Sequence, residues 1–464
     1  MLVNPTSITL PHSLNPLITA LISADLRPVI VGGYVRDTLL SIPSKDIDIE
    51  VFDVESLEKL SVILEGFGQV NSVGKSFGVL KMQVGGLEID FSLPRQEEKI
   101  AQGHKGFEVR LDSTLSFKEA ARRRDFTINA MGYDLTNNRL LDPFHGREDL
   151  QKKCLEVVDA ATFIEDPLRL YRAMQFTARF ELYPSSQLIN LAQEMVKSGM
   201  LEELPKERIF EEFRKLFLKS KKPSIGFEVM DTFGMLDYFK VLKRLQGVPQ
   251  NPKYHPEGDV WVHTMMVIDA MQKLHGDDEK ENFMLSLAAL CHDLGKPATT
   301  KLKDGIIRAI GHENVGVAIA ESFLERLTDE KQLIQNILPL VKHHLKPRQF
   351  YDQGAKSVAI RRLARAVNIR QLVVVAKADF LGRTTEEAIK GDFLAGDWLL
   401  EKAKKLKVEE QALEPMIQGR DLIAQGLNPS KHFKNILNAA YEAQMDGAFL
   451  THDEGLVWLR KFLT

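Results

Sequence analysis

The spacing of apolar and polar residues divides the chain into a mixed α/β region and a longer helical region. Between residues 29 and 134, short apolar runs of strand length alternate with stretches of helical spacing. Beyond about residue 150, apolar positions recur almost entirely at helical spacing. The pattern predicts an α+β head, built as a small mixed sheet with helices, followed by mostly α-helical domains.

One predicted strand, 46–51, carries the first candidate chemistry, because its acidic and aliphatic residues alternate strictly. Asp46 and Asp48 therefore fall on one face, with Ile47 and Ile49 on the other. Two carboxylates this close repel each other unless a cation neutralises them, and hard oxygen ligands suit Mg²⁺. A solvated edge strand is the alternative reading of such a pattern taken alone.

The segment before this strand adds a phosphate-binding pattern. A β-branched run at 28–31 leads into Gly32 and Gly33, which allow backbone N–H groups to approach a phosphate. Arg36 follows in a predicted helix and can hold a phosphate oxygen. Together with the acid pair, the segment indicates phosphoryl transfer with two metal ions.

The segments GGYVRD and KDIDIEVF resemble the head signature of the nucleotidyltransferase superfamily. Within it, they are similar to bacterial tRNA nucleotidyltransferases (CCA-adding enzymes) and their bacterial poly(A) polymerase relatives. This resemblance implies tRNA, CTP and ATP as partners and Mg²⁺ in the head. It also implies a third metal carboxylate five residues before an Arg, which is Asp90 before Arg95; Glu88, on the same strand face, is the rival candidate.

Residues 122–131, RRRDFTINAM, form the second motif of the head. Arginines followed by Asp and Asn supply donors for a triphosphate, and both donors and acceptors for ribose hydroxyls. The segment resembles the RRD-x-x-x-NA motif of the family, with Arg124, Asp125 and Asn129 at the matching positions. Between the motifs, residues 94–118 are polar and are expected to form a mobile loop, which in CCA-adding enzymes helps the switch from C to A addition.

A helix predicted to start at Glu165 carries the third motif. Asp166, Arg169 and Arg172 are spaced three apart and are expected to share one face, where they can imitate a base-pairing edge for C or A. A capped surface helix with an internal salt bridge is the alternative. The segment resembles the EDxxR motif that serves the family as a protein template, although Gln175 stands where the family often has Arg.

A separate cluster of histidines and acids follows residue 250. Mixed imidazole and carboxylate ligands suit a divalent transition metal, whose bound water can hydrolyse phosphoesters. The pattern resembles the HD phosphohydrolase domain, and the implied metal is Ni²⁺, Co²⁺ or Mn²⁺. The residues at its ligand positions are His263, His292, Asp293 and Asp379, with His312 and either His343 or His344 as possible extensions.

Bulk properties place limits on this interpretation. With 464 residues and a formal net charge of −3, any nucleic-acid surface must be a local patch. Cys154 and Cys291 match no metal or disulfide framework and suit a reducing cytoplasm. No signal-peptide pattern or apolar run of membrane-span length occurs, so we expect a cytoplasmic protein without a membrane or obligate protein partner.

The motifs divide the chain into a head (1–150), a neck (151–250), an HD domain (251–394) and a helical tail (395–464). Three functions compete. The first is a CTP(ATP):tRNA nucleotidyltransferase that builds or repairs the 3′-terminal CCA and carries an HD hydrolase. The others are a poly(A) polymerase on the same head, and an HD nucleotide phosphohydrolase with a vestigial head.

Overall fold

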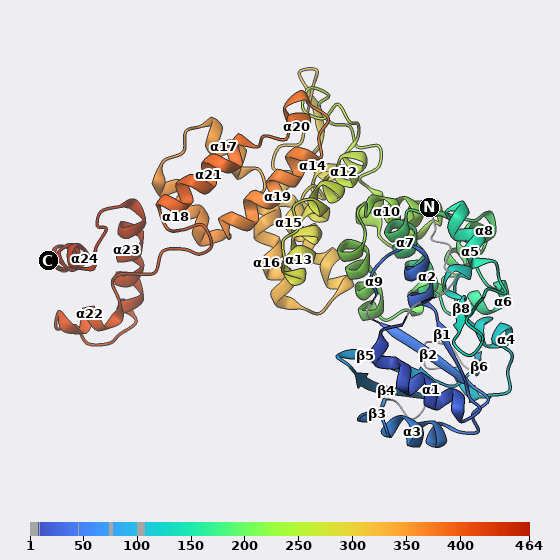
Figure 1. Ribbon diagram of the computed structural model, residues 1–464. Coiled ribbons are helices and arrows are strands. Elements are labelled where there is room, and N and C mark those ends of the chain that lie inside the picture. The colour runs from blue at the N-terminus through green and yellow to red at the C-terminus, as the bar shows by residue number, and fades with distance from the viewer. Residues whose placement is uncertain (1–7, 9, 45, 74–77, 100–106) are drawn as a thin grey trace. The chain divides into compact units, whose positions relative to one another are not determined.

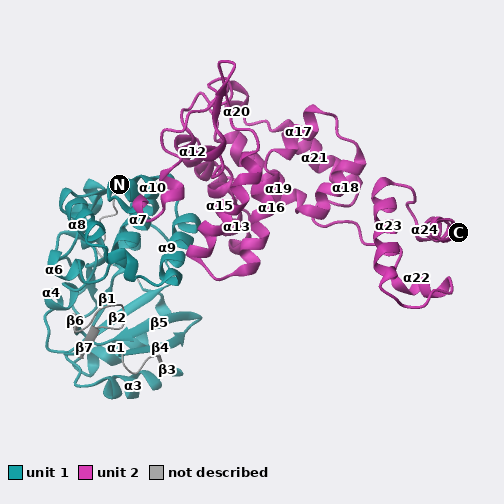
Figure 2. Ribbon diagram, turned by 180° about the vertical axis from the view of Figure 1, so that it is seen from behind, with its two compact units in different colours: residues 1–235 teal, residues 236–464 magenta. Residues whose placement is uncertain are grey.

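The structure of the protein, a computed structural model, describes residues 8, 10–44, 46–73, 78–99 and 107–464. The chain folds into two compact units, Met1–Met235 and Leu236–Thr464 (Figure 2). Most strands belong to the first unit, whereas the second is almost entirely helical (Figure 1). The predicted α+β head followed by helical domains is confirmed, and the finer four-part division stays a prediction.

A seven-stranded sheet with the order β3-β4-β5-β2-β1-β8-β9 forms the centre of the first unit. Strands β2 and β5 run parallel, whereas the other neighbouring pairs are antiparallel, so the sheet is mixed as predicted. Its strands are β1 (Arg27–Val31), β2 (Ile47–Phe52), β3 (Val70–Val73), β4 (Val79–Val84), β5 (Leu87–Ser92), β8 (Gly132–Asp134) and β9 (Arg139–Leu141).

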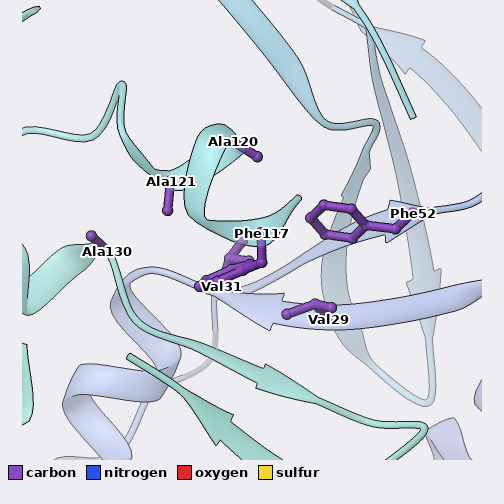
Figure 3. Close-up of a cluster of buried hydrophobic side chains, with 7 residues drawn as sticks. All are labelled: Val29, Val31, Phe52, Phe117, Ala120, Ala121 and Ala130. Carbon is purple, nitrogen blue, oxygen red and sulfur yellow. The ribbon is translucent and has the colours of Figure 1, made fainter. Parts of the chain in front are cut away.

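The core of the head is where the sheet meets the short helix α4 (Phe117–Ala121). Ser116 starts this helix through a capping box with Glu119. Figure 3 shows the buried side chains that pack here: Val29, Val31, Phe52, Phe117, Ala120, Ala121 and Ala130. Because α4 is fixed by this core, the segment 122–125 that follows it is held next to the sheet.

The remaining helices of the first unit surround the sheet or follow it in the chain, and the later ones include the region predicted as a neck (Figure 1). Helix α1 packs on β1. Apart from α4, the helices of this unit are η1 (His12–Leu14), α1 (Asn15–Ser23), α2 (Gly33–Leu39), α3 (Leu57–Glu65), η2 (Thr127–Asn129), α5 (Gly146–Lys152), α6 (Ala160–Phe163), α7 (Leu168–Phe180), α8 (Ser186–Lys197), η3 (Met200–Glu203), α9 (Lys206–Lys219) and α10 (Ser224–Thr232). A two-stranded parallel pair is formed by β10 (Cys154–Leu155), which follows α5, and β11 (Tyr183–Pro184), which precedes α8.

The predicted loop across 94–118 contains regular structure on both sides of its centre. Strands β6 (Arg95–Lys99) and β7 (Phe107–Leu111) pair antiparallel as a separate ribbon. The expectation of a plain loop is therefore wrong for these flanks. The central residues, 100–106, lie outside the described part of the chain.

In the second unit, α12 packs on α13 and α19, and α13 packs on α16 and α19. His263 lies on α12 and Asp379 on α19, whereas His292 and His344 directly follow α13 and α16. The helices are η4 (Met235–Asp237), which starts at the unit boundary, α11 (Lys240–Lys243), α12 (Val260–Gln272), α13 (Glu279–Cys291), α14 (Lys296–Thr299), α15 (His312–Leu327), α16 (Lys331–His343), α17 (Lys346–Asp352), α18 (Ser357–Ala366), α19 (Ile369–Leu381), α20 (Glu386–Lys390), α21 (Leu394–Lys405), α22 (Gly419–Ala424), α23 (His432–Asp446) and α24 (His452–Leu463). A short hairpin pairs β12 (Lys301–Lys303) with β13 (Ile306–Arg308). Among the described residues, no helix combines the length and apolar character needed to cross a membrane.

Candidate active sites

The predicted head carboxylates meet where β2 and β5 run side by side. In the register of the two parallel strands, Asp48 lies opposite Asp90. Asp46 comes one residue before β2 and is exposed. Glu88, the rival to Asp90, faces Gln83 of β4 instead and has no partner on β2. The structure thus brings Asp48 and Asp90 together and leaves Glu88 further along the strand.

The electrostatics of this pair suit a cation. Although Asp48 stays accessible, protein atoms around it remove part of its hydration and raise its pKa; Arg124 opposes this shift, and Asp90 and Asp46 add to it. Lys81 of β4 partly neutralises the site, with its Nζ 3.2 Å from Asp90 Oδ2. Carboxylates that face each other on adjacent strands destabilise a sheet unless a positive charge lies between them.

The glycines predicted to bind phosphate lie at the turn between β1 and α2. Gly32 has φ of +69°, which favours glycine, and a Cβ there would lie 2.9 Å from Nη1 of Arg124. Gly33 begins α2. Arg124 Nη1 donates to the carbonyl of Asn129 at 3.4 Å, and its Nε has no hydrogen-bond partner among the described residues. The glycine turn and this guanidinium therefore lie together beside the carboxylates.

Asp125 and Asn129 form a buried hydrogen-bonded chain. Asn129 Nδ2 donates to Asp125 Oδ1 at 3.0 Å, and Arg36 Nη1 donates to Asn129 Oδ1. Arg172 of α7 binds Asp125 Oδ2 at 2.7 Å. Burial opposes ionisation of Asp125, but the Arg172 charge and the Asn129 hydrogen bond outweigh it and lower the pKa of Asp125.

Arg36 is more enclosed than the sequence suggests. Its side chain is 5% exposed and binds Asp37 at 2.6 Å, and its guanidinium lies over the rings of Phe176 and Phe180 of α7. Arg179, also on α7, reaches Asp37 at 3.4 Å. Arg36 thus links the glycine turn to α7, and its predicted direct contact with a phosphate stays a prediction.

Helix α7 carries the predicted base-reading residues, with one difference. The helix begins at Leu168, so Asp166 precedes it and accepts the backbone N–H of Leu168. The expectation of one helical face for all three side chains is therefore wrong for Asp166. Arg169 donates to the carbonyls of Thr162 and Arg123 at 2.8 and 2.7 Å.

Two contacts around α7 had no signal in the sequence. Arg208 of α9 lies 3.3 Å from Asp166 Oδ2, and Arg123 lies 2.9 Å from the fully buried Glu50 of β2. Both join residues far apart in sequence, so only the packed structure brings them together. Gln175, where the family often has Arg, is buried, and its Nε2 has no hydrogen-bond partner among the described residues.

The predicted ligands of the second site converge in the second unit. Nitrogen and oxygen atoms of His263, His292 and Asp379 lie within 4.8 Å of one another, and all three residues are buried. Asp293 lies at the centre, with Oδ2 3.1 Å from His292 Nε2 and 3.9 Å from His263 Nε2. The four sequence-predicted ligands therefore form one cluster.

A second group shares Asp293. Asp293 Oδ1 lies 3.2 Å from His312 Nε2 and 4.0 Å from His344 Nε2. Of the two histidines left open by the sequence, His344 joins this group, whereas His343 does not. Burial lowers the pKa of His344 to about 3, so its ring is neutral and able to act as a ligand at neutral pH.

The donor set fits a divalent transition metal. His292 Nε2 and both carboxylate oxygens of Asp293 are buried and make no aligned hydrogen bond with a described residue, although the Lys296 ammonium forms an ion pair with Asp293 Oδ2 at 2.6 Å. Buried polar atoms seldom stay unpaired, and mixed imidazole and carboxylate ligands are those of transition ions.

A cavity of about 250 Å³ opens onto this cluster. Lys296 and Arg383 line it, with Lys296 Nζ 2.6 Å from Asp293 and Arg383 2.8 Å from both oxygens of Asp379. Two cations beside a ligand cluster provide binding for an anionic group such as a phosphate.

Three families known from other proteins match successive parts of the chain. The Poly A polymerase head domain matches residues 29–156, and the probable RNA and SrmB-binding site of polymerase A matches residues 191–245. The HD domain matches residues 260–383. These matches cover the strands with the carboxylate pair, part of the neck, and the metal-ligand cluster.

Curated relatives match over most of their length. The multifunctional CCA protein of Methylobacillus flagellatus is 38% identical over 371 residues, which cover 77% of this chain and 85% of that protein. The multifunctional CCA protein of Xanthomonas campestris pv. campestris (strain B100) is 34% identical over 413 residues, which cover 87% of this chain and 94% of that protein.

Solved structures share the fold. The Thermotoga maritima CCA-adding enzyme in complex with tRNA superposes with a TM-score of 0.60 at 21% identity, over 98% of this chain and 97% of that one. A CCA-adding enzyme in complex with CTP gives a TM-score of 0.63 at 22% identity, over 98% and 96% of the chains. The likeness extends over both units.

Proposed function

Because the chain belongs to the family of multifunctional CCA proteins and is a nucleotidyltransferase, we propose that it adds or repairs the 3′-terminal CCA of tRNA from CTP and ATP without a nucleic-acid template. Support for these partners comes from neighbours solved with tRNA, CTP and ATP. The observation that carries the proposal is the opposition of Asp48 and Asp90 on β2 and β5, beside the glycine turn.

In this proposal Asp46, Asp48 and Asp90 hold Mg²⁺. When bound, Mg²⁺ supplies charge stabilisation on the triphosphate and lowers the pKa of the attacking 3′-hydroxyl. Gly32, Gly33 and Arg124 receive the triphosphate, because the turn exposes backbone N–H groups and the Nε of Arg124 has no hydrogen-bond partner among the described residues.

Base choice in this proposal belongs to α7 and the segment before it. Asp166 offers acceptors and Arg169 offers donors to the edge of C or A, whereas U and G present a different pattern. Arg172 acts through Asp125, which it binds at 2.7 Å, and Asn129 completes the ribose side of the pocket. Arg36 holds Asn129 in place and connects it to α7.

The second unit is proposed to be a phosphohydrolase that uses Ni²⁺, Co²⁺ or Mn²⁺. The residues that hold the metal are His263, His292, Asp293 and Asp379, and His312 with His344 extend the cluster. When bound, such a metal supplies a hydroxide nucleophile at neutral pH. Lys296 and Arg383 bind the phosphate in the cavity, and 2′-phosphates or 2′,3′-cyclic phosphates are the proposed substrates.

One experiment tests the pairing of activities. Purified protein is given tRNA that lacks CCA, with CTP and ATP, and separately a 2′,3′-cyclic nucleotide with each metal in turn. We expect CCA addition with Mg²⁺ and hydrolysis with a transition metal. Addition of long adenylate tails instead would favour the poly(A) polymerase alternative, and hydrolysis without nucleotide addition would favour the vestigial head.

A further inference from the structure

Three histidines of the second site are each fixed by a backbone carbonyl. Nδ1 of His292, His312 and His344 lies 2.6, 2.6 and 2.7 Å from the carbonyl oxygen of the residue three positions earlier. All three lie at helix ends, where carbonyls near the turn can be reached. A carbonyl only accepts, so each ring keeps its proton on Nδ1 and turns Nε2 toward the site.

His263 differs from these three. It lies inside α12, four residues after the Asp259 N-cap, and its Nδ1 faces the side chain of Glu257 with Oε1 at 2.8 Å. Its Nε2 lies 3.1 Å from Asp379 Oδ1. Nδ1 makes no aligned hydrogen bond with a described residue, whereas Nε2 forms one with Asp379, so the two carboxylates compete for the proton of the ring. A metal bound at Nε2 would leave that proton on Nδ1, toward Glu257.

The Glu257 carboxylate is buried. Its side chain is 1% exposed, and it forms no ion pair with a Lys or Arg among the described residues. A buried carboxylate without donors is costly. Glu257 is hydrogen-bonded to Nδ1 of His255 at 2.9 Å and accepts from the backbone N–H of Thr384 at 3.2 Å, and Nδ1 of His263 lies 2.8 Å from its Oε1.

The contact between Glu257 and Thr384 lies close to a second predicted ligand, Asp379. Thr384 follows Arg383, whose Nη2 lies 2.8 Å from both oxygens of Asp379. By accepting the Thr384 N–H, Glu257 holds in place the chain at the end of α19, the helix that carries Asp379. One carboxylate from the segment before α12 thus constrains two ligands on two helices.

We propose that Glu257 is a positioning residue for the metal of the second unit: it fixes the ring orientation and Nδ1–H tautomer of His263 and steadies the backbone beside Asp379. The proposal rests on the metal-binding part of the proposed function and goes beyond it by naming a residue outside the ligand set. A carboxylate on the far nitrogen also makes the imidazole a more basic ligand than a carbonyl does.

The test compares Glu257→Gln with wild type. Full-length protein freed of metal is titrated with Co²⁺ by calorimetry and by visible absorption, with excess Mg²⁺ present to occupy the head carboxylates. The amide keeps the size of the side chain but cannot accept from three donors, so Co²⁺ affinity should fall about 10- to 100-fold. The Co²⁺ absorption spectrum should change, and nucleotide addition by the head should not.

Glu313→Gln is the matched control. Glu313 Oε2 lies 3.9 Å from Nδ1 of His312, but that nitrogen is already held by the Ala309 carbonyl at 2.6 Å. The substitution removes the same charge beside a ligand histidine without removing the group that orients it. Co²⁺ affinity should stay within about twofold of wild type. An equal loss in both variants would mean that charge, and not positioning, explains the effect.

The outcomes separate this proposal from the proposed function. Wild-type Co²⁺ affinity and spectrum in Glu257→Gln would overturn the positioning role, and so would a wild-type protein that binds no Co²⁺. A wild type that binds Co²⁺ but hydrolyses no phosphoester would remove the hydrolase and leave the role of Glu257 standing. If Glu257→Gln does not fold, histidine ¹⁵N spectra of the metal-bound wild type decide: a His263 that carries no proton on Nδ1 contradicts the proposal.

Discussion

Asp48 of β2 lies opposite Asp90 of β5 in a parallel register, although the two residues are 42 positions apart in the sequence. The strands between them, β3 and β4, lie on the outer side of β5. The chain therefore leaves β2, forms β3 and β4, and returns as β5, which places the Asp90 carboxylate beside that of Asp48. Like charges opposite each other cost a sheet stability, which metal binding offsets.

Asp46→Ala and Asp48→Ala should each abolish nucleotide addition while leaving the fold intact. Each removes a proposed metal ligand, which is worth several kcal/mol of transition-state stabilisation, or on the order of 10³-fold in rate. Nucleotide incorporation is measured beside tRNA binding and thermal unfolding. Near wild-type incorporation by either variant would show that the metal assignment is wrong.

Asp90 and Glu88 form a matched pair on one strand, because only Asp90 faces Asp48. Asp90→Asn should lower the rate of nucleotide addition by at least about 10²-fold, since it removes a charge that Mg²⁺ requires. Glu88→Gln removes the same charge and breaks a half-exposed ion pair with Lys81, so its rate should stay near wild type. The reverse order of effects would make Glu88 the third carboxylate.

Asp166→Ala and Arg169→Ala should reduce the choice among nucleotides more than they reduce triphosphate binding. Each leaves one group of the base edge unpaired, at a cost of about 1–3 kcal/mol. Incorporation of UTP and GTP relative to CTP and ATP is the measurement. Equal discrimination in the variants and in wild type would remove the template role.

The contact between Asp166 and Arg208 adds a control to this experiment. Arg208→Ala frees the Asp166 carboxylate without removing it. We expect a smaller loss of discrimination than in Asp166→Ala, because the half-exposed pair is worth about 1 kcal/mol or less. A loss as large as that of Asp166→Ala would mean that Arg208 itself contacts the base.

His292→Ala and Asp293→Ala should abolish phosphoester hydrolysis and leave CCA addition unchanged. The two sites lie in separate compact units and use different ligands. Chelation should stop both activities. Added Mg²⁺ should restore addition alone, and Ni²⁺, Co²⁺ or Mn²⁺ should restore hydrolysis. Loss of CCA addition in either variant would show that the units depend on each other.

The features that were predicted correctly from the sequence are those set by the local pattern of residues. Strict alternation placed Asp48 on the opposite strand face from Ile47 and Ile49, and the glycine turn before α2 needed only the positive φ of Gly32. These features depend on neighbouring residues. The pairing of Asp48 with Asp90 depends on strand order, which the spacing to Arg95 suggested only through family resemblance.

Other features follow from packing and had no local signal. Arg36 has the motif position of a phosphate ligand, yet α7 covers it with Phe176 and Phe180. Asp166 was expected inside a helix, but α7 begins two residues later. Glu257 is an ordinary acid in sequence, and its role emerges only when the end of α19 comes beside it.

The most direct test of the central claim is nucleotide addition to a tRNA that ends before its CCA, with Mg²⁺ as the metal. With CTP alone the protein should add two C residues, and with CTP and ATP it should add C, C and A and then stop. Asp48→Ala should add none. Continued adenylate addition from ATP alone, or no addition by wild type, would contradict the account.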